Sequence, residues 1–390
     1  MIKQYYKQAL AQLRQHPLIS IIGIVGTALS IFLIMLVVMM QQVKVAPFSP
    51  ESNRNRFLHV HYMSISHKDW GNGTSNGPMS VQTAREVYKS LKTPEAVTVY
   101  CCMTVSTPVS LPGAPAIGAD VRETDDTFFH VFDFQFTDGK PYDEATFTAG
   151  RPVAVITESI SRALFGSIQS VGKEFLLSHA PYRVVGVVKD VSTLADMAYG
   201  QVWIPFTSTN LSNDTWSDNH MGMMSVTLLA HDREDFDEIR AEAKRRMNEY
   251  NSILADQGYT LIDRNRPYDQ ETQSISFAAN LEPDLKAARR ERVIIFIILL
   301  LVPAINLSSM TQSRLRQRVA EIGVRRAFGS TRIEMVGQIV MENLVITLLA
   351  GAIGLLISIL FAYWGTDILF AQPYSVTLNA PTVDSRILLQ

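Results

Sequence analysis

The sequence predicts an α+β domain outside the membrane, made of two lobes with mixed sheets and packed helices, on an α-helical transmembrane domain. Three observations favour this fold class. Apolar residues make up 47% of the 390 residues and charged residues only 18%, whereas roughly 25% charged is usual in soluble proteins. The apolar residues concentrate in three uncharged runs. Between the first two runs lies a stretch of about 250 residues with both strand and helix patterns.

The composition excludes several classes of protein. Such a high apolar content rules out disorder as the main state, and two cysteines rule out a disulfide scaffold. A net charge of −2 provides no overall basic field, so nucleic acid is not an expected partner.

The first apolar run, residues 18–40, follows an N-terminal tail at 1–17. As a helix it is about 34 Å long, enough to cross a hydrocarbon core of roughly 30 Å. A cleaved signal peptide is the alternative, but signal cores are usually only about 7–15 residues long. The run therefore predicts a retained transmembrane helix.

Two further membrane helices are predicted at residues 293–310 and 344–364, because both runs are apolar on every face. Pro303 interrupts the first of them, which neighbouring helices can compensate in a membrane. Small residues on two of the three helices would let helices approach closely. They are Gly26 and Ser30 on the first helix, and Ala350, Gly354 and Ser358 on the third.

The distribution of Lys and Arg predicts the orientation of these helices. Basic residues precede the first helix, and six arginines lie in the loop at 311–343, so both segments should be cytoplasmic. Residues 41–292 then lie on the far side, with a helical stalk near 281–292. Residues 365–390 return to that side and end in an apolar stretch, which predicts that a fourth span is missing from this chain.

The large domain offers one arrangement that could bind a metal. In the strand predicted at 57–63, His59 and His61 point away from the apolar face, and His67 follows nearby. Because two histidines on one strand do not make a metal site, a solvated strand face is the favoured interpretation, and no metal is expected.

Other local patterns in this domain predict structural elements. Residues 97–106 alternate as a strand with Met103 and Val105 on its apolar face, which places Cys101 and Cys102 on opposite faces. The two cysteines are interpreted as packing residues, with a vicinal disulfide or a reactive thiol as the alternative. A helical stripe, predicted to pack on a sheet, is formed by Phe236, Ile239, Ala243, Met247, Tyr250 and Leu254.

The sequence gives no support for intrinsic catalysis. Gly166 and Gly172-Lys173 resemble a phosphate loop, but the spacing is one residue too long and Glu174 replaces the Mg²⁺-binding Ser or Thr. The motifs of serine hydrolases, zinc proteases and dithiol redox proteins do not occur. We therefore expect no catalytic residues and no cofactor.

The predicted cytoplasmic loop forms a helix, a turn and a second helix. Gly329 suits the position that ends a helix, and Thr331 with Glu334 matches a capping box. Before the turn lie Glu321, Ile322, Gly323, Arg325 and Arg326. A docking element for a partner is favoured, and attraction of the arginines to anionic lipid is the alternative.

These motifs carry a resemblance to a known family. The segment EIGVRRAFG at 321–329 resembles the signature loop of MacB/FtsX-type ABC transporter permeases. The outer region resembles that family's periplasmic core domain through DDTFFHVFDFQFTDGKPY at 125–142, VAVITESISRALFG at 153–166, VGKEF at 171–175 and YRVVGVVKDV at 182–191. The family has four spans, whereas this chain shows three.

The resemblance implies a permease subunit without a fused ATPase, in a bacterial inner membrane with a large periplasmic domain. It would act as a homo- or heterodimer with a cytoplasmic ABC ATPase subunit, driving export or efflux through the loop at 311–343. A periplasmic adaptor, an outer-membrane channel and membrane lipid are further expected partners. The alternatives are an FtsX-like regulatory adaptor, a lipoprotein-release permease and a membrane-anchored enzyme.

Overall fold

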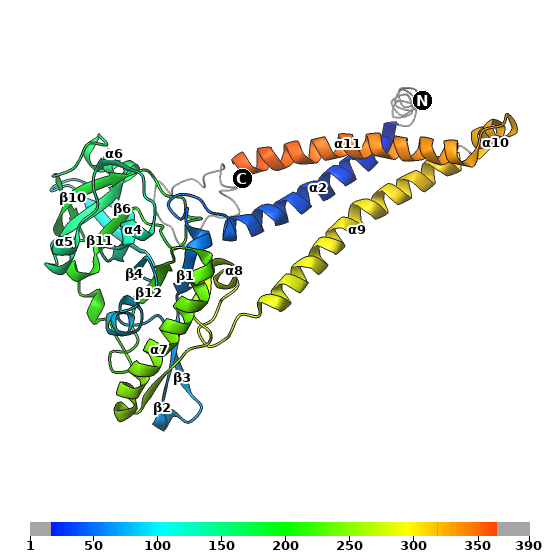
Figure 1. Ribbon diagram of the computed structural model, residues 1–390. Helices are drawn as coiled ribbons and strands as arrows, with labels where there is room; N and C mark the ends of the chain where they lie inside the picture. The colour runs from blue at the N-terminus through cyan, green and yellow to red at the C-terminus, as the bar shows by residue number, and fades with distance from the viewer. Residues whose placement is uncertain (1–16, 318, 365–390) are drawn as a thin grey trace. The chain divides into compact units, whose positions relative to one another are not determined.

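The computed structural model describes residues 17–317 and 319–364. Among these, residues 17–42 and 286–364 form one compact unit, the helical unit, and residues 43–285 form a second, the β-rich unit (Figure 1). The expected fourth span and most of the predicted N-terminal tail lie outside the described residues.

Three helices are long and apolar enough to cross a membrane. They are α2 (Pro17–Val45), α9 (Leu285–Gln317) and α11 (Arg332–Trp364), and the short helix α10 (Val319–Ala327) lies between the last two. Helix α9 continues through Pro303 and includes most of the segment predicted as a stalk.

The β-rich unit contains fourteen described strands and six described α-helices. The strands are β1 (Phe57–Val60), β2 (Met63–His67), β3 (Thr74–Gly77), β4 (Ala96–Cys101), β5 (Val105–Ser110), β6 (Ile117–Thr124), β7 (Phe136–Gly139), β8 (Val153–Thr157), β9 (Glu174–Leu177), β10 (Ala180–Val188), β11 (Val202–Pro205), β12 (Met224–Leu229), β13 (Tyr259–Ile262) and β14 (Tyr268–Asp269). The helices are α3 (Val81–Thr83), α4 (Phe128–Val131), α5 (Glu144–Thr148), α6 (Glu158–Phe165), α7 (Phe236–Leu254) and α8 (Gln270–Gln273).

Six strands close into a barrel in the order β11-β8-β10-β9-β5-β6. The ring closes because β6 and β11 pair in parallel, with Val121 opposite Val202. Aliphatic and aromatic side chains fill the interior, among them Val109, Ala119, Val121, Ile156, Phe175, Val184 and Ile204. Closure removes the free strand edges that an open sheet of this size would expose.

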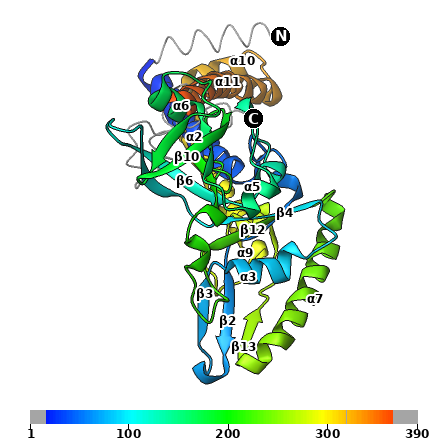
Figure 2. The ribbon, with the colours of Figure 1, turned by 90° about the vertical axis from the view of Figure 1, so that its left-hand side faces the viewer.

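A more open sheet continues from the barrel through β4, β12, β1 and β14. The barrel lies in the chain between β4 and β12, which pair directly along six residues. Helix α7 covers one side of this region beside β13 (Figure 2). All six residues of the predicted helical stripe are buried there, which confirms that prediction.

The solvated strand face predicted for His59 is wrong. The His59 side chain is fully buried, because the side chains of Thr227 and Gln270 cover it from β12 and α8. Within residues 17–317 and 319–364, no three His, Cys, Asp or Glu side chains come together in a group that could hold a metal ion.

The single strand predicted at 97–106 is also wrong. Strand β4 ends at Cys101, and the chain bends before β5, which leaves Met103 and Val105 about half exposed, at 50% and 54%. The bend brings the thiols of Cys101 and Cys102 within hydrogen-bonding reach, so they do not point to opposite faces. This contact lowers the pKa of Cys101 to about 7.

Candidate functional site

The turn between α10 and α11 is fixed by its own backbone. Gly329 has a φ of +97°, and its N–H donates to the Arg326 carbonyl at 3.1 Å, while the Phe328 N–H donates to Val324 at 3.1 Å. Because φ is positive, a side chain at position 329 would strain the backbone, even though no atom lies within 4 Å of an added Cβ.

The first turn of α11 has a capping box. The Thr331 N–H donates to the Glu334 carboxylate at 3.0 Å, and the Glu334 N–H donates to the Thr331 hydroxyl at 3.3 Å. Two backbone donors that a helix start leaves without partners are thus satisfied.

Side chains also link α10 to α11. Arg325 Nη1 donates to Gln338 Oε1 at 2.9 Å, and Gln338 Nε2 donates to the buried Glu342 at 3.0 Å. Arg325 therefore braces the two helices against each other, whereas Arg326 is exposed.

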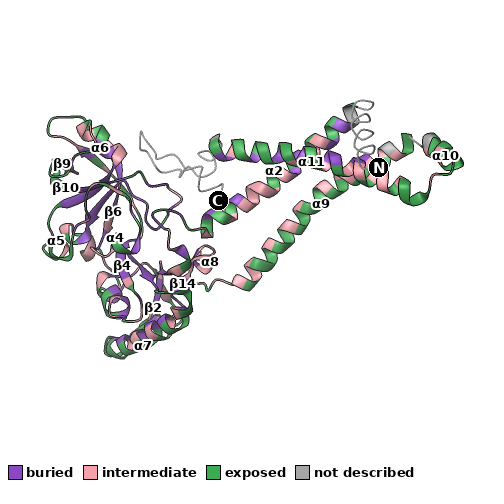
Figure 3. Cartoon of the chain, turned by 45° about the horizontal axis from the view of Figure 1, so that its top comes forward, coloured by how far each residue is buried: buried purple, intermediate pink, exposed green. Residues whose placement is uncertain are grey.

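Three apolar side chains are exposed at this end of the hairpin, among exposed polar residues such as Arg326 and Arg332. Phe328 is 88% exposed, Ile333 85% and Val324 57%, and we call these three residues the tip patch. Figure 3 shows α10 largely exposed. The charges of the loop, on which the sequence prediction rested, did not indicate the tip patch. An aromatic residue directly before the helix-ending glycine, in a polar loop, was the available signal.

The remaining predicted residues of the loop lie on α10. Ile322 is half-buried, and Gly323 is exposed with no atom within 4 Å of an added Cβ. Glu321 belongs to the same helix, but its side chain lies outside the described part of the structure.

Helix α11 contacts α2 through small residues. A Cβ added at Gly354 would lie 2.7 Å from the Ala28 carbonyl oxygen, so only glycine allows this backbone approach. Ala350 and Ser358 are buried on α11, and the rings of Phe32 and Phe361 meet edge to face at 5.5 Å between centroids.

Gly26 serves a different contact. A Cβ there would lie 2.6 Å from Asn306 Nδ2 on α9, and the hydroxyl of Ser30 donates to the Gly26 carbonyl of its own helix at 2.8 Å. The structure thus brings Gly354 to α2 and Gly26 to α9, so the small residues form two helix contacts and not one.

The end of α2 is held by side chains of the β-rich unit, to which its last turn belongs. Arg54 Nη1 donates to the carbonyls of Val43 at 2.7 Å and Ala46 at 3.1 Å, and Gln270 Nε2 donates to the carbonyl of Lys44 at 2.8 Å. A helix end leaves such carbonyls without partners, and its partial negative charge favours a cation. We call this arrangement the α2 joint.

The charged groups of the α2 joint are fully buried and satisfied. Arg54 is 3% exposed and Glu51 is 0% exposed. Arg54 Nε donates to Glu51 Oε2 at 2.7 Å, and Glu51 Oε1 accepts from the N–H groups of Met197 and Ala198 at 2.8 and 3.0 Å. The remaining guanidinium nitrogen donates to the Leu194 carbonyl at 2.9 Å. This pairing offsets the cost of burying two charges.

His59 orients the glutamine of the α2 joint. Its Nε2 lies 2.9 Å from Gln270 Oε1, and its Nδ1 lies 3.1 Å from the Thr227 hydroxyl. Because an amide oxygen only accepts, Nε2 carries the proton. Burial lowers the pKa of His59 to about 3, so the ring is neutral. The sequence analysis missed the joint, and its only local signal was a Glu and an Arg three residues apart.

Two family models together match most of the chain. A family model described as the MacB-like periplasmic core domain matches residues 18–246, and one described as the FtsX-like permease C-terminal region matches residues 293–389.

Two curated relatives are each less than 25% identical to this chain over the aligned residues. The uncharacterized ABC transporter permease YknZ of Bacillus subtilis is 22% identical over 244 residues, which are 61% of this chain and 55% of the relative. The macrolide export ATP-binding/permease protein MacB of Burkholderia pseudomallei is 24% identical over 274 residues, 70% of this chain and 39% of the relative. The chain thus spans about half or less of the length of these relatives.

Two solved structures that are similar to part of this chain are outer domains of such proteins. The periplasmic region of MacB from Actinobacillus actinomycetemcomitans has a TM-score of 0.36 at 19% identity, covering 52% of this chain and 88% of that one. The extracellular domain of YknZ from Gram-positive bacteria has a TM-score of 0.37 at 14% identity, covering 52% of this chain and 100% of that one.

Proposed function

Because the chain belongs to the MacB/FtsX-type ABC transporter permeases, we propose that it is the permease subunit of an export or efflux system. Members of this family are membrane permeases with a periplasmic domain. In the proposed mechanism a separate cytoplasmic ATPase subunit hydrolyses ATP, and this chain converts that step into a change of its periplasmic domain. The chain itself has no catalytic role in the proposal.

The observation that carries the proposal is the apolar tip patch on a stiff hairpin. Phe328 is almost fully exposed, whereas the backbone behind it is fixed by the Gly329 turn and the Thr331 capping box. Exposed apolar groups on a rigid support are typical of binding hot spots. We assign this hairpin as the element that docks on the ATPase, with Arg326 as a charged contact at its rim.

The α2 joint supports the second half of the mechanism. Helix α2 is continuous from Pro17 to Val45, and its last turn is bonded to Arg54 and Gln270. A helix held this firmly at its end passes its displacement to the loop that contains Met197 and to strand β1. We propose that the barrel and the open sheet are the two lobes that respond.

The proposed location is a bacterial inner membrane. The arginines of the hairpin favour a cytoplasmic position for it, and the β-rich unit would then lie in the periplasm. The proposed partners beyond the ATPase are a second permease copy, membrane lipid, a periplasmic adaptor and an outer-membrane channel. The relatives found do not favour a regulatory adaptor or a lipoprotein-release permease.

The proposed docking role is tested by comparing two phenylalanines with similar exposure. Phe328→Ala removes the centre of the tip patch, and Phe277→Ala removes a phenylalanine that is 82% exposed in the β-rich unit. Each full-length variant is reconstituted in lipid with the ATPase that co-purifies with the chain, and permease-stimulated ATP hydrolysis and ATPase affinity are measured.

We expect Phe328→Ala to weaken the complex by about 30-fold, as hot-spot losses of about 2 kcal/mol do. Phe277→Ala should leave affinity and stimulation unchanged. Equal results for the two variants, or a chain that co-purifies with no ATPase, would contradict the proposal.

A further inference from the structure

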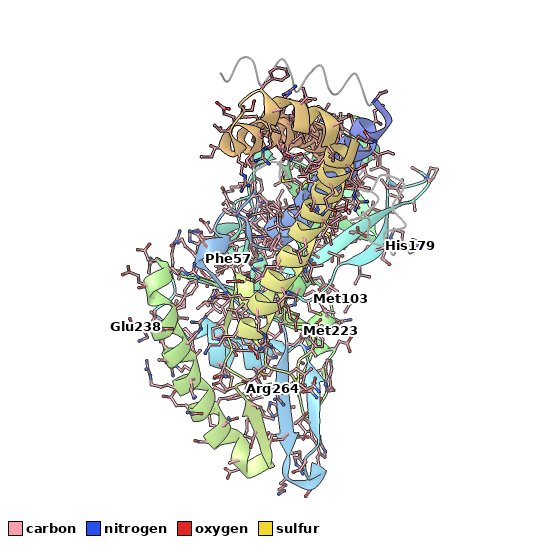
Figure 4. The ribbon with its side chains drawn as sticks, turned by 90° about the vertical axis from the view of Figure 1, so that its right-hand side faces the viewer. Phe57, Met103, His179, Met223, Glu238 and Arg264 are labelled. Carbon is pink, nitrogen blue, oxygen red and sulfur yellow. The ribbon has the colours of Figure 1, made fainter. Side chains whose placement is uncertain are left out.

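One end of the barrel opens into a pocket of about 370 Å³, which we call the barrel mouth. Its apolar walls come from strands around the ring and from the segments that follow β4 and β11. They include Met103, Val105, Val121, Leu177, Tyr182, Ile204 and Leu211. Figure 4 shows Met103 near Met223, whose carbonyl accepts from the Cys102 N–H at 2.9 Å.

A single carboxyl group lies in this wall. Strand β6 alternates, so Ala119 and Val121 fill the barrel core and Glu123 is the next residue on the same face. Glu123 pairs in register with Ile204 of β11 and accepts a hydrogen bond from the Thr209 hydroxyl. The described lining of the barrel mouth contains no Lys, Arg or His.

The environment of Glu123 is unfavourable for a negative charge. Burial raises the pKa of Glu123 to about 7, and the hydrogen bond from Thr209 opposes this only in part. A carboxylate in apolar surroundings is stabilised most by a cation placed against it. The barrel mouth supplies apolar walls and an anion, but no such cation.

We propose that the barrel mouth binds an organic amine with an apolar body. The ammonium group pairs with Glu123, and the body packs along Met103, Leu177 and Tyr182. The volume lies in the range of small-molecule sites, and mouths of β-barrels are common places for them. A larger cavity of about 750 Å³ lies beside β7 and β10 and is lined by exposed charges of both signs, among them Lys140, Asp143 and Glu174. Its lining therefore gives no preference for a cationic or an anionic ligand.

The inference is independent of the proposed export, because binding is measured without ATP or an ATPase. The probes are 4-phenylbutylamine and 4-phenylbutanol, which share an apolar body and differ in the charged group. Isothermal titration uses the full chain in lipid nanodiscs, with empty nanodiscs as the reference for partition into lipid.

We expect the wild type to bind the amine at least about tenfold more tightly than the alcohol, the size of one charge-assisted hydrogen bond. Glu123→Gln should remove this preference and leave alcohol binding unchanged, which also shows that the variant is folded. Met103→Trp should weaken both probes by filling the mouth. Glu174→Gln, in the larger cavity, is the matched control and should change neither.

Proton release provides a second readout. Near pH 6.5 the amine should displace the proton of Glu123, so the heat of binding should depend on the ionisation enthalpy of the buffer. Among the described residues, the groups that interact with Glu123 are Cys101 of β4, Tyr142, Tyr182 of β10 and Thr209. Because the pKa of Cys101 is also about 7, the measurement is repeated with Cys101→Ser, which should keep the proton release.

Three results would overturn the inference. They are equal affinity for amine and alcohol, amine binding by Glu123→Gln at the wild-type level, and full binding by Met103→Trp. Proton release that disappears with Cys101→Ser and persists with Glu123→Gln would assign the titrating group to the thiol and would also reject the role of Glu123.

Discussion

The α2 joint and the hairpin of α10 and α11 both place an arginine near a helix end, but they use it in opposite ways. Arg54 is 3% exposed and bonds three carbonyls and a carboxylate. Arg326 is exposed beside the apolar tip patch. The buried arginine makes an internal link, whereas the exposed one lies on the surface that we propose as the docking site.

The largest effect is expected from breaking the joint. Arg54→Met leaves Glu51 buried without its cation, and removing one partner of a buried pair costs about 3–5 kcal/mol. Arg326→Met should change the free energy of unfolding by less than about 0.5 kcal/mol. Denaturant unfolding of the full chain, followed by the fluorescence of buried Trp203, measures both.

The double variant Glu51→Leu/Arg54→Met separates charge from packing. Because it leaves no unpaired charge, it should recover part of the loss caused by Arg54→Met. The rest should remain, because the backbone groups that bond Arg54 and Glu51 lose their partners. A single Arg54→Met change that costs less than about 1 kcal/mol would show that the joint does not hold the end of α2.

The next effect concerns pH. The pKa of His59 is about 3 in the folded chain, against 6.5 ordinarily, so below pH 6.5 the unfolded chain binds a proton that the folded chain does not. Its contribution to stability is therefore complete above pH 6.5 and is lost as the pH falls toward 3, by up to about 1.4 kcal/mol per pH unit.

His59→Gln should flatten this dependence in denaturant unfolding between pH 6.5 and pH 4.5. Burial also lowers the pKa of His61, so part of the slope should remain. His231→Gln, at a side chain that is 63% exposed, should keep the full slope. If the pH dependence of the free energy of unfolding were unchanged in the His59 variant, the His59 ring could not be buried in its neutral form.

The smallest expected changes in stability concern two glycines of the hairpin. Gly329→Ala places a side chain at positive φ and should destabilise the turn by about 1–2 kcal/mol. Gly323→Ala lies in α10 with open space around it and should stabilise that helix by about 0.5–1 kcal/mol. Amide hydrogen exchange across residues 319–340 measures both, and equal signs for the two changes would contradict the assigned turn.

Local patterns in the sequence predicted local structure well. The stripe from Phe236 to Leu254 needs only helical periodicity, and it is buried as expected. Helix caps are local in the same sense, because the side chains of Ser80 and Thr157 each accept from the N–H group three residues further along the chain.

Long-range contacts were not predictable in this way. His59 is covered by Gln270, which is 211 residues away in the chain, so alternation along β1 could not distinguish water from protein on that face. The link between Glu51 and Met197 spans 146 residues. The position of Phe328 before the helix-ending glycine indicates only that it lies at a turn, and does not show whether a partner or a core covers it.

The pairing of β4 with β12 has a consequence for how such chains diversify. Residues 105–205 leave and re-enter the open sheet at adjacent strands, so the barrel is an insertion in the chain between two neighbours. Its outer side shares a hydrophobic core with Phe57 and Leu229 of the open sheet. Its core and its closed ring come from that one segment, whereas its mouth is completed by Cys101, Met103, Thr209 and Leu211 from the flanking segments. A replacement of this segment would therefore also replace the backbone groups of Leu194, Met197 and Ala198 that bond Arg54 and Glu51. A new barrel must keep these groups in place for the α2 joint to persist, whereas the hairpin is untouched by the exchange.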